Sequence, residues 1–315
     1  MQWPAKPSTP VRFRSQPPSY SSGNSSAGRA QPCQGWGREF ESRFPLQFLN
    51  PGMPTDLKRP AVLCFSGHDP SGGAGIQADI ETIISHHCHP CSIITALTEQ
   101  DTHNAKAIYP QSVPEFIRQT ETLLADIEIS AIKIGLLGST DIAIALSHIL
   151  NQLPTIPVIL DPVLAAGGGK DFSDPQLIET IIHKLLPLCT VITPNSHEAR
   201  LLTNLNDLKS CGEKLQQHDA EFVLITGAHE QSQTVDNLLF GPDNRHEVFH
   251  WERLTSEYHG SGCTLTSSIA ALIAHNLDPF TAISEAQEYT WNSLAGAYRT
   301  GHGQLNPNRL FWTEE

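Results

Sequence analysis

Two glycine-rich segments contain the residue types best suited to chemistry. The first, at 67–75, reads GHDPSGGAG and leaves backbone N–H groups open to the close approach of a ligand. The second, GSGCT at 260–264, opens an apolar helix, whose N-terminus gathers N–H groups and partial positive charge. Gly260, Ser261 and Gly262 therefore predict an anion hole for a phosphoryl group in transfer. The alternatives are a tight turn without a ligand and a small residue packed at a helix start.

Cys263 falls in the first turn of the helix that follows the second segment. The helix dipole at that position should lower the pKa of the thiol and favour the thiolate. Neither glycine-rich segment fits the dinucleotide fingerprint GxGxxG or the P-loop pattern GxxxxGK[ST].

Two carboxylates follow strand-like runs. Asp161 ends the run PVILD, and Glu198 follows the run TVIT within TPNSHEA. Carboxylates beyond two strand ends suit Mg²⁺, which takes few protein carboxylates and keeps water and substrate phosphates as its other ligands. The alternatives are a turn aspartate before proline for Asp161 and a capping-box charge for Glu198.

Cys88-His-Pro-Cys91 follows His86 and His87 and has the spacing of half a zinc site. No second Cys/His pair of suitable spacing follows, so the sequence favours a helix-to-strand turn over structural zinc.

Val/Ile-rich runs alternate with amphipathic helical patterns from residue 61 onward. This alternation predicts an α/β fold in three layers, with a mainly parallel central sheet and helices on both faces. In such sheets ligands bind at the carboxyl ends of the strands. Expected strands are 61–66, 92–97, 131–135, 157–161, 190–193 and 222–226, then a hairpin of 235–240 and 248–254. Expected helices are 76–84, 113–127, 142–150, 174–186, 262–275 and 279–299.

The first 56 residues differ in composition from the rest. They contain nine of the 23 prolines, and they carry six basic and three acidic residues. We expect 1–56 to be a disordered or spurious extension, with Met53 a possible true start, and 57–315 to be one domain. A transit peptide is an alternative reading of this acid-poor stretch.

The charge and hydropathy of the chain argue against nucleic acid and membranes as partners. The remainder of the chain carries 30 acidic and 14 basic residues, a formal charge of −16, which disfavours nucleic acid as a partner. No apolar run reaches the length of a membrane span. Seven cysteines at irregular spacing argue against a disulfide framework and for a cytoplasmic protein.

Taken together, the loops resemble a known family. The segments GHDPSGGAGIQAD at 67–79, ITAL at 94–97 with Gln100, KIGL at 133–136, DPV at 161–163, TPN at 193–195 with Glu198, and HGSGCT at 259–264 occur in its order. The chain resembles hydroxymethylpyrimidine/phosphomethylpyrimidine kinases of thiamine biosynthesis, within the ribokinase-like superfamily. The resemblance covers about 61–312.

The resemblance implies transfer of the γ-phosphoryl group of ATP to 4-amino-5-hydroxymethyl-2-methylpyrimidine and then to its monophosphate. It implies Mg²⁺, small-molecule substrates and a homodimer. By motif position, the implied residues are Gln100, Gly67, Asp79, Leu136 and Val163 for the pyrimidine, Asp161 and Glu198 for Mg²⁺, Gly260, Ser261 and Gly262 for the anion, and Cys263 as the catalytic base.

The nucleotide side departs from the family pattern. The segment LITGAHE at 224–230 lacks a lysine that many members have, although Thr226 and Gly227 remain as nucleotide contacts. Lys170 is expected to compensate, and with Lys133 to attract an anionic nucleotide to an acidic protein.

Three rival functions remain at this point. A pyridoxal/pyridoxine kinase shares most of these loops. A Cys–His hydrolase would use Cys263 with His259 and would need no ATP. A non-catalytic pyrimidine-binding module would bind ligand without releasing ADP.

Overall fold

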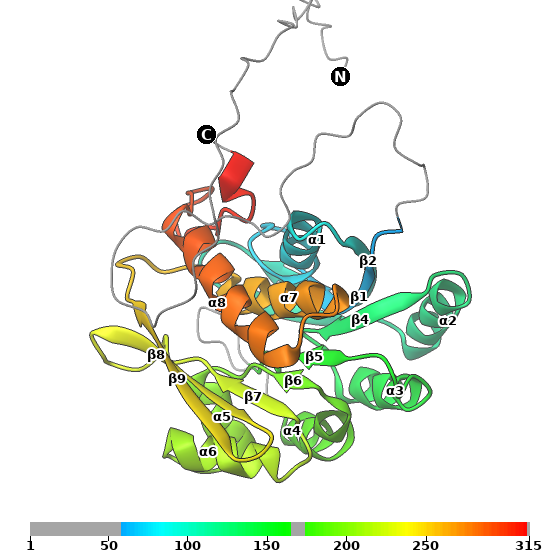
Figure 1. Cartoon of the computed structure of the whole chain (residues 1–315). Helices are drawn as coiled ribbons and strands as arrows, with labels where there is room; N and C mark the ends of the chain where they lie inside the picture. Colours follow the sequence, from blue (N-terminus) through cyan, green and yellow to red (C-terminus); the bar gives the residue numbers. More distant parts are fainter. Residues whose placement is uncertain (1–57, 165–173, 314–315) are drawn as a thin grey trace, which may run out of the picture. The chain divides into compact units, whose positions relative to one another are not determined.

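The computed structural model describes residues 58–164 and 174–313. Its centre is a nine-stranded sheet in the order β3-β2-β1-β4-β5-β6-β7-β8-β9 (Figure 1). The strands from β2 to β7 in this order run parallel, while β3, β8 and β9 each pair antiparallel with a neighbour. The strands are β1 Ala61–His68, β2 His89–Gln100, β3 Ala105–Pro110, β4 Ile129–Ile134, β5 Val158–Leu160, β6 Val191–Ile192, β7 Phe222–Ile225, β8 Thr234–Gly241 and β9 Arg245–Glu252.

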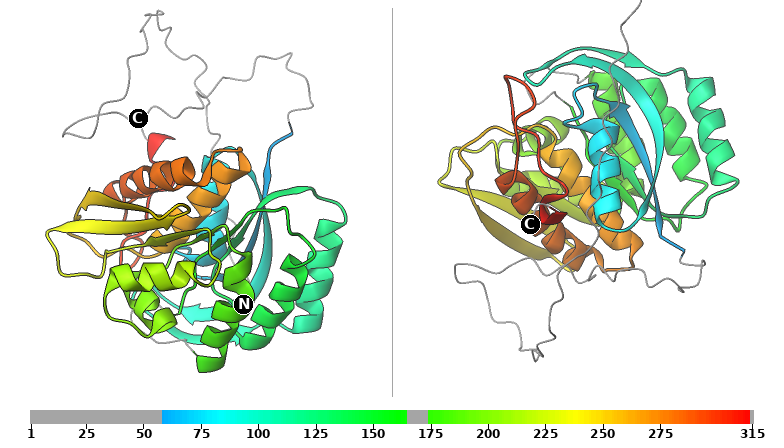
Figure 2. Two further views of the ribbon diagram at one scale, coloured as in Figure 1. Left: turned by 60° about the horizontal axis from the view of Figure 1, so that its bottom comes forward. Right: turned by 90° about the horizontal axis from the view of Figure 1, so that it is seen from above.

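Helices cover both faces of the sheet, which confirms the three-layer α/β prediction (Figure 2). One face packs against α1, α7 and α8, and the other against α2 to α6. The helices are α1 Gly75–Ser85, α2 Val113–Leu124, α3 Thr140–Leu150, α4 Pro175–Thr180, α5 Ser196–Thr203, α6 Leu208–Gln216, α7 Ser261–Ala274 and α8 Pro279–Ala295.

Strand β1 shows why the sheet is buried on both sides. Its side chains alternate between the two cores: Leu63 and Phe65 enter one, and Val62 and Cys64 enter the other. All four are at most 1% exposed. A strand covered on both faces reads as a continuous apolar run, which is how the sequence presents it.

Among the described strands and α-helices, β3 and α6 were not expected from the sequence, and α5 was implied only by the capping-box interpretation of Glu198. The helix expected over 174–186 is interrupted instead: α4 ends at Thr180, a π-helical turn spans Ile181–Leu185, and a 3₁₀ turn spans Leu186–Leu188. Pro187 lies in this last turn, where its missing N–H cannot continue an α-helix.

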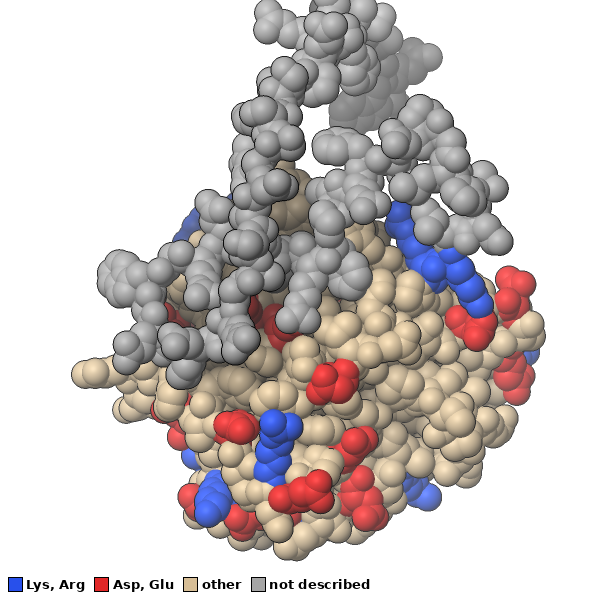
Figure 3. Space-filling view, in the orientation of Figure 1, with Lys and Arg blue, Asp and Glu red and all other residues tan. Residues whose placement is uncertain are grey.

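Within the described ranges, no helix has the length and apolarity needed to cross a bilayer. Where Figure 3 leaves the surface uncovered by grey atoms, acidic and basic side chains are interspersed. The predictions for 1–56, including the start at Met53, fall outside the described residues and stay predictions.

Candidate active site

The predicted chemistry gathers at one edge of the sheet, because the parallel strands end on the same side. Gly67 lies near the end of β1, Asp161 directly follows β5, and Thr226 directly follows β7. Helix α7 begins at Ser261 and packs across β1, β4 and β5. Its N-terminus lies beside the end of β5, because a Cβ added at Gly262 would lie 3.3 Å from Oδ2 of Asp161.

The two glycine-rich loops touch each other through their backbones. Gly260 adopts φ 78°, and a Cβ there would lie 2.0 Å from the carbonyl oxygen of Gly73. Only glycine permits both this left-handed conformation and this approach. The predicted anion hole, Gly260, Ser261 and Gly262, therefore lies against the first loop.

Asp161 and Glu198 form a buried pair of like charges, 6% and 5% exposed. Burial raises the pKa of Asp161 to about 6, and the Lys133 ammonium opposes that rise. Burial and the Asp161 carboxylate raise the pKa of Glu198 to about 8. Two buried carboxylates that repel each other make a place for a cation.

Asp161 and Glu198 fit an Mg²⁺ site better than a metal site in which protein side chains supply all the ligands. Among the described residues, no three His, Cys, Asp or Glu side chains lie together to enclose a metal ion. Mg²⁺ needs only one or two carboxylates, with water and phosphate oxygens completing its octahedron. Glu198 also forms the capping box of α5 with Asn195. The capping interpretation of Glu198 is therefore correct, and it is compatible with a role as a metal ligand.

The turn after β5 is strained and held by both carboxylates. Val163 has φ 34°, a conformation that β-branched residues rarely adopt. The N–H of Leu164 donates to Oε1 of Glu198 over 3.1 Å, and the N–H of Val163 donates to Asp161. Strain of this kind, of order 1–3 kcal/mol, persists only where the surroundings impose it.

The predicted thiolate at Cys263 is wrong for this structure. Burial raises the pKa of the thiol to about 11, with the Asp161 and Asp79 carboxylates adding to the rise. The Lys133 ammonium and the N–H of Gly75 favour the thiolate, but the desolvation cost is larger. Cys263 is therefore a protonated thiol at neutral pH.

The structure argues against ligand contact by Asp79 and Lys133, because both side chains are completely buried. Lys133 Nζ lies 2.8 Å from Oδ1 of Asp79 and donates to Ser66 Oγ over 3.0 Å. Ser267 donates to the same aspartate oxygen over 2.7 Å. The lysine expected to attract a nucleotide thus neutralises a core carboxylate beneath Cys263.

His259 is engaged by Asp69. Nε2 of His259 lies 3.0 Å from Oδ2 of Asp69, and these side chains are 12% and 1% exposed. Although burial opposes it, hydrogen bonds from His259 and Ser71 hold the pKa of Asp69 well below its usual range. The pair joins the first glycine loop to the residue that precedes the anion hole.

Three of the residues predicted to bind the pyrimidine, Gly67, Gln100 and Leu136, lie on β1, on β2 and just after β4. Gly67 faces Leu136, whose Cδ2 would lie 2.8 Å from a Cβ at position 67. Thr95 donates to the carbonyl of Leu136 and fixes that loop. Gln100 ends β2 opposite Ala105 of β3, half-buried on the hairpin that extends the sheet.

A pocket of about 470 Å³ opens beside the anion hole, lined by Ser261, Gly262 and Thr226. Two tryptophans, Trp251 and Trp291, also line it. A buried network supports its floor. The N–H of Gly227 donates to Asn237 Oδ1 over 3.0 Å, Asn237 Nδ2 donates to Gln287 Oε1 over 2.9 Å, and Trp251 Nε1 donates to the same oxygen over 3.2 Å.

The loop between β7 and β8 is held by one guanidinium. Arg253 donates to the carbonyls of Ala228, Glu230, Ser232 and Thr234 over 2.7 to 3.2 Å. Arg200 adds a bidentate pair with Glu230 at 2.7 and 3.0 Å. The segment that lacks the lysine is therefore held in shape by Arg253 and Arg200. Lys170 lies outside the described residues.

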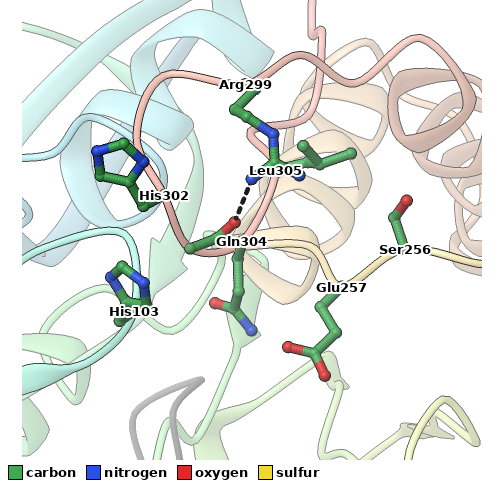
Figure 4. A pocket seen from close by; sticks show the side chains of 8 residues that line it. His103, Ser256, Glu257, Arg299, His302, Gln304 and Leu305 are labelled. Carbon is green, nitrogen blue, oxygen red and sulfur yellow. Dashed lines mark hydrogen bonds between the residues drawn. The ribbon is translucent and has the colours of Figure 1, made fainter.

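A second pocket, of about 410 Å³, lies where the β2–β3 turn meets the C-terminal segment (Figure 4). His103, His302 and Glu257 line it, and Arg299 donates to the carbonyl of Gly303 over 3.2 Å. The N–H of Gly303 donates to Thr102 Oγ1 over 3.0 Å, which fastens the two segments together.

Residues 86–88 form the turn from α1 into β2, so the helix-to-strand turn that the sequence favoured includes Cys88, while His89 to Cys91 begin the strand itself. The sulfur of Cys88 lies 3.3 Å from Nε2 of His275, and burial raises the pKa of this thiol to about 12.

Sequence reasoning missed Asp69, Arg253 and Arg309 as organisers of these loops. Asp69 lies inside the recognised first motif, so its Asp-Pro-Ser context offered a signal. Arg253 lies in the strand expected at 248–254 and binds carbonyl groups of the β7–β8 segment, which no sequence pattern reveals. Arg309 lies in the C-terminal segment, and its partners, Gly73, Glu81 and Thr264, are distant in sequence.

Comparison with known proteins places the chain in one family. The model of the family described as phosphomethylpyrimidine kinase matches residues 69–308. The hydroxymethylpyrimidine/phosphomethylpyrimidine kinase of Escherichia coli (strain K12) is 33% identical over 256 residues, covering 78% of this chain and 96% of that protein.

Solved structures agree in fold. A phosphomethylpyrimidine kinase from Clostridium difficile 630 has a TM-score of 0.65 at 30% identity, covering 74% of this chain and 98% of that one. An ADP complex of Bacillus subtilis pyridoxal kinase has a TM-score of 0.76 at 24% identity, covering 82% and 100%, which shows the shared ribokinase-like fold alone.

Proposed function

Because the chain belongs to the phosphomethylpyrimidine kinase family and is therefore a kinase, we propose that it phosphorylates 4-amino-5-hydroxymethyl-2-methylpyrimidine and its monophosphate with ATP. The product is the pyrimidine diphosphate precursor of thiamine. The observation that carries the proposal is the convergence of the anion hole, the Asp161–Glu198 pair and Cys263 at one edge of the sheet. The Cys–His hydrolase alternative is disfavoured because burial raises the pKa of Cys263 to about 11, which leaves little of the thiolate that a nucleophile requires.

The acceptor binds where β1, β2 and β4 end. In this proposal Gly67, Leu136 and Val163 enclose the pyrimidine ring, and Gln100 hydrogen-bonds its polar edge. Glycine is needed at position 67, because a side chain there would collide with Leu136 and occupy the space proposed for the ring. Asp79 is assigned a structural role, since its buried carboxylate is paired with Lys133.

The backbone N–H groups of Gly260, Ser261 and Gly262 stabilise the charge of the phosphoryl group during transfer. Asp161 and Glu198 would hold Mg²⁺, which neutralises phosphate charge when bound. Because Cys263 is already a protonated thiol, it cannot accept a proton, and in this proposal it donates a hydrogen bond beside the acceptor hydroxyl. The hydroxyl proton passes to an oxygen of the transferred phosphoryl group as the new O–P bond forms and the bond to ADP breaks. Phosphoryl transfer depends mainly on positioning and charge stabilisation, so no stronger base is needed.

The nucleotide occupies the 470 Å³ pocket beside the anion hole, where Thr226 is a lining residue. Gly227 supports the pocket through its hydrogen bond to the lining residue Asn237. The two tryptophans supply apolar surface for the purine. Lys170, in the segment after β5, supplies a phosphate contact. The pocket and the anion hole share Ser261 and Gly262, so a nucleotide there directs its phosphates towards the acceptor.

An ADP-release assay on the full chain tests the function. The reaction contains ATP, Mg²⁺ and one acceptor: hydroxymethylpyrimidine, its phosphate or pyridoxal. We expect release with the first two and a much lower kcat/KM with pyridoxal. ADP release with none of them contradicts the proposal, and preference for pyridoxal replaces it with the pyridoxal kinase alternative.

We further propose a cytoplasmic homodimer. Leu97 and Tyr109 are 43% and 53% exposed and lie opposite each other on the β2–β3 hairpin, which offers an apolar contact to a second copy. The six described cysteines are free, as a reducing compartment allows. Light scattering measures the mass, and Leu97→Asp should convert a dimer to a monomer.

A further inference from the structure

Arg309 lies outside the recognised loops and yet contacts both of them. Its side chain is 1% exposed, and it forms an ion pair with Glu81 at 2.9 Å. Nη2 donates to the carbonyl of Gly73 over 2.5 Å, and Nε donates to Thr264 Oγ1 over 2.9 Å. One guanidinium from the C-terminal segment therefore reaches the first glycine loop and the first turn of α7.

The hydroxyl of Thr264 passes this contact to the anion hole. Thr264 Oγ1 accepts from Arg309 and donates to the carbonyl of Gly260 over 2.9 Å. A trans peptide is planar, so fixing the Gly260 carbonyl fixes the N–H of Ser261 on the opposite side. Ser261 lines the 470 Å³ pocket, and its N–H is one of the groups of the predicted anion hole.

The peptide between Gly73 and Ala74 is held at both ends. Arg309 binds its carbonyl, and its N–H donates to Oδ2 of Asp69 over 2.8 Å. The same Asp69 oxygen lies 3.0 Å from His259, the neighbour of Gly260. Gly73 and Gly260 are also the two glycines whose backbones touch.

The main chain of Arg309 is itself fixed by α8. The hydroxyl of Tyr289 donates to its carbonyl over 2.7 Å, and the N–H of Asn308 donates to the carbonyl of Ser293 over 2.9 Å. The guanidinium of Arg309 therefore extends from a backbone fixed by α8 to the first glycine loop and to the first turn of α7.

We propose that Arg309 is a positioning residue for phosphoryl transfer. It orients the anion-hole N–H groups through Thr264, and it aligns the first glycine-rich loop, residues 67–75, through Gly73. The proposal rests on the kinase function argued above. Its role is to orient backbone groups, so its loss should lower kcat more than it raises either KM.

The test compares Arg309→Lys, Thr264→Val and Thr264→Ser with the wild type by steady-state kinetics and thermal unfolding. We expect kcat to fall about 100-fold in Arg309→Lys and about tenfold in Thr264→Val, with both KM values within about threefold of wild type. Thr264→Ser should restore most of the lost kcat, because it keeps the hydroxyl. Arg299→Lys, a surface arginine of the same segment, is the control and should match the wild type.

Hydrogen exchange measured by mass spectrometry supplies a readout that needs no activity. Thr264→Val should exchange faster over 260–266, while α3 exchanges as in the wild type. Wild-type kcat in both Arg309→Lys and Thr264→Val overturns the inference, as does a loss that only follows the unfolded fraction. If the wild type releases no ADP, the proposed function is contradicted, and hydrogen exchange alone then tests the inference. In that case unchanged exchange over 260–266 in Thr264→Val overturns it.

Discussion

Replacing Glu198 by Gln should remove a loss of stability that the ligand-free wild type suffers as the pH rises. Burial and Asp161 raise the pKa of Glu198 from 4.5 to about 8 in the folded state. The folded protein therefore binds a proton that the unfolded chain releases, and the stability supplied by that proton is lost as pH rises from about 4.5 to about 8. At 1.36 kcal/mol for each pKa unit, the loss amounts to about 4 to 5 kcal/mol.

Glutamine cannot ionise, so the variant avoids this loss. It does sacrifice a hydrogen bond, because the two oxygens of Glu198 accept from the N–H groups of Asn195 and Leu164 and an amide NH₂ cannot replace one of them. An unmet buried N–H costs about 1 to 3 kcal/mol. We expect Glu198→Gln to be less stable than wild type near about pH 5 and more stable above about pH 8.

Urea unfolding at a series of pH values, without Mg²⁺, measures both curves. Glu121→Gln, at an exposed position on α2, is the matched control and should run parallel to the wild type. Two parallel curves for Glu198→Gln and wild type would refute the reasoning. Added Mg²⁺ should stabilise the wild type at alkaline pH and the variant much less.

Three further outcomes are expected. Lys133→Met should lower the free energy of unfolding by about 3 to 5 kcal/mol, because it leaves Asp79 charged and unpaired in the core, and the double variant with Asp79→Asn should recover much of the loss in urea unfolding. The rate of Cys263 alkylation by iodoacetamide should rise about tenfold for each pH unit up to about pH 9, and a plateau near neutral pH would contradict the raised thiol pKa. Arg253→Lys should raise KM for ATP about tenfold and leave KM for the pyrimidine unchanged in initial-rate kinetics, because only a guanidinium reaches all four loop carbonyls; equal KM values for ATP would refute it.

The layers of the fold follow directly from hydrophobic pattern. Runs such as 61–65 and 222–225 are apolar throughout, and the structure buries them on both faces. Strand β3 was missed because its sequence, AKAIYP, is half-exposed and ends in proline. Helix α6 was missed because Gly212 interrupts it, although that glycine is required where Phe240 packs 2.1 Å from a potential Cβ.

The sequence predicted which loops form the candidate site, but it did not predict the charge states and ion pairs of the residues in it. Sequence order placed Asp161, Glu198 and the GSGCT segment together, since parallel strands end at one edge. The state of Cys263 could not be predicted, because a helix dipole favours the thiolate while burial, which only the tertiary structure reveals, opposes it more strongly. Lys133 likewise resembled a phosphate-binding lysine until its partner on α1, far away in sequence, was known.

The buried pair of Lys133 and Asp79 also constrains how this sequence can diverge. Either single replacement leaves an uncompensated charge in the core, so a chain that loses one residue first passes through a poorly folded intermediate. Evolution should therefore keep both residues or exchange both together. In an alignment of the family the two positions should vary as a unit, and a member with an apolar residue at one should carry an uncharged residue at the other.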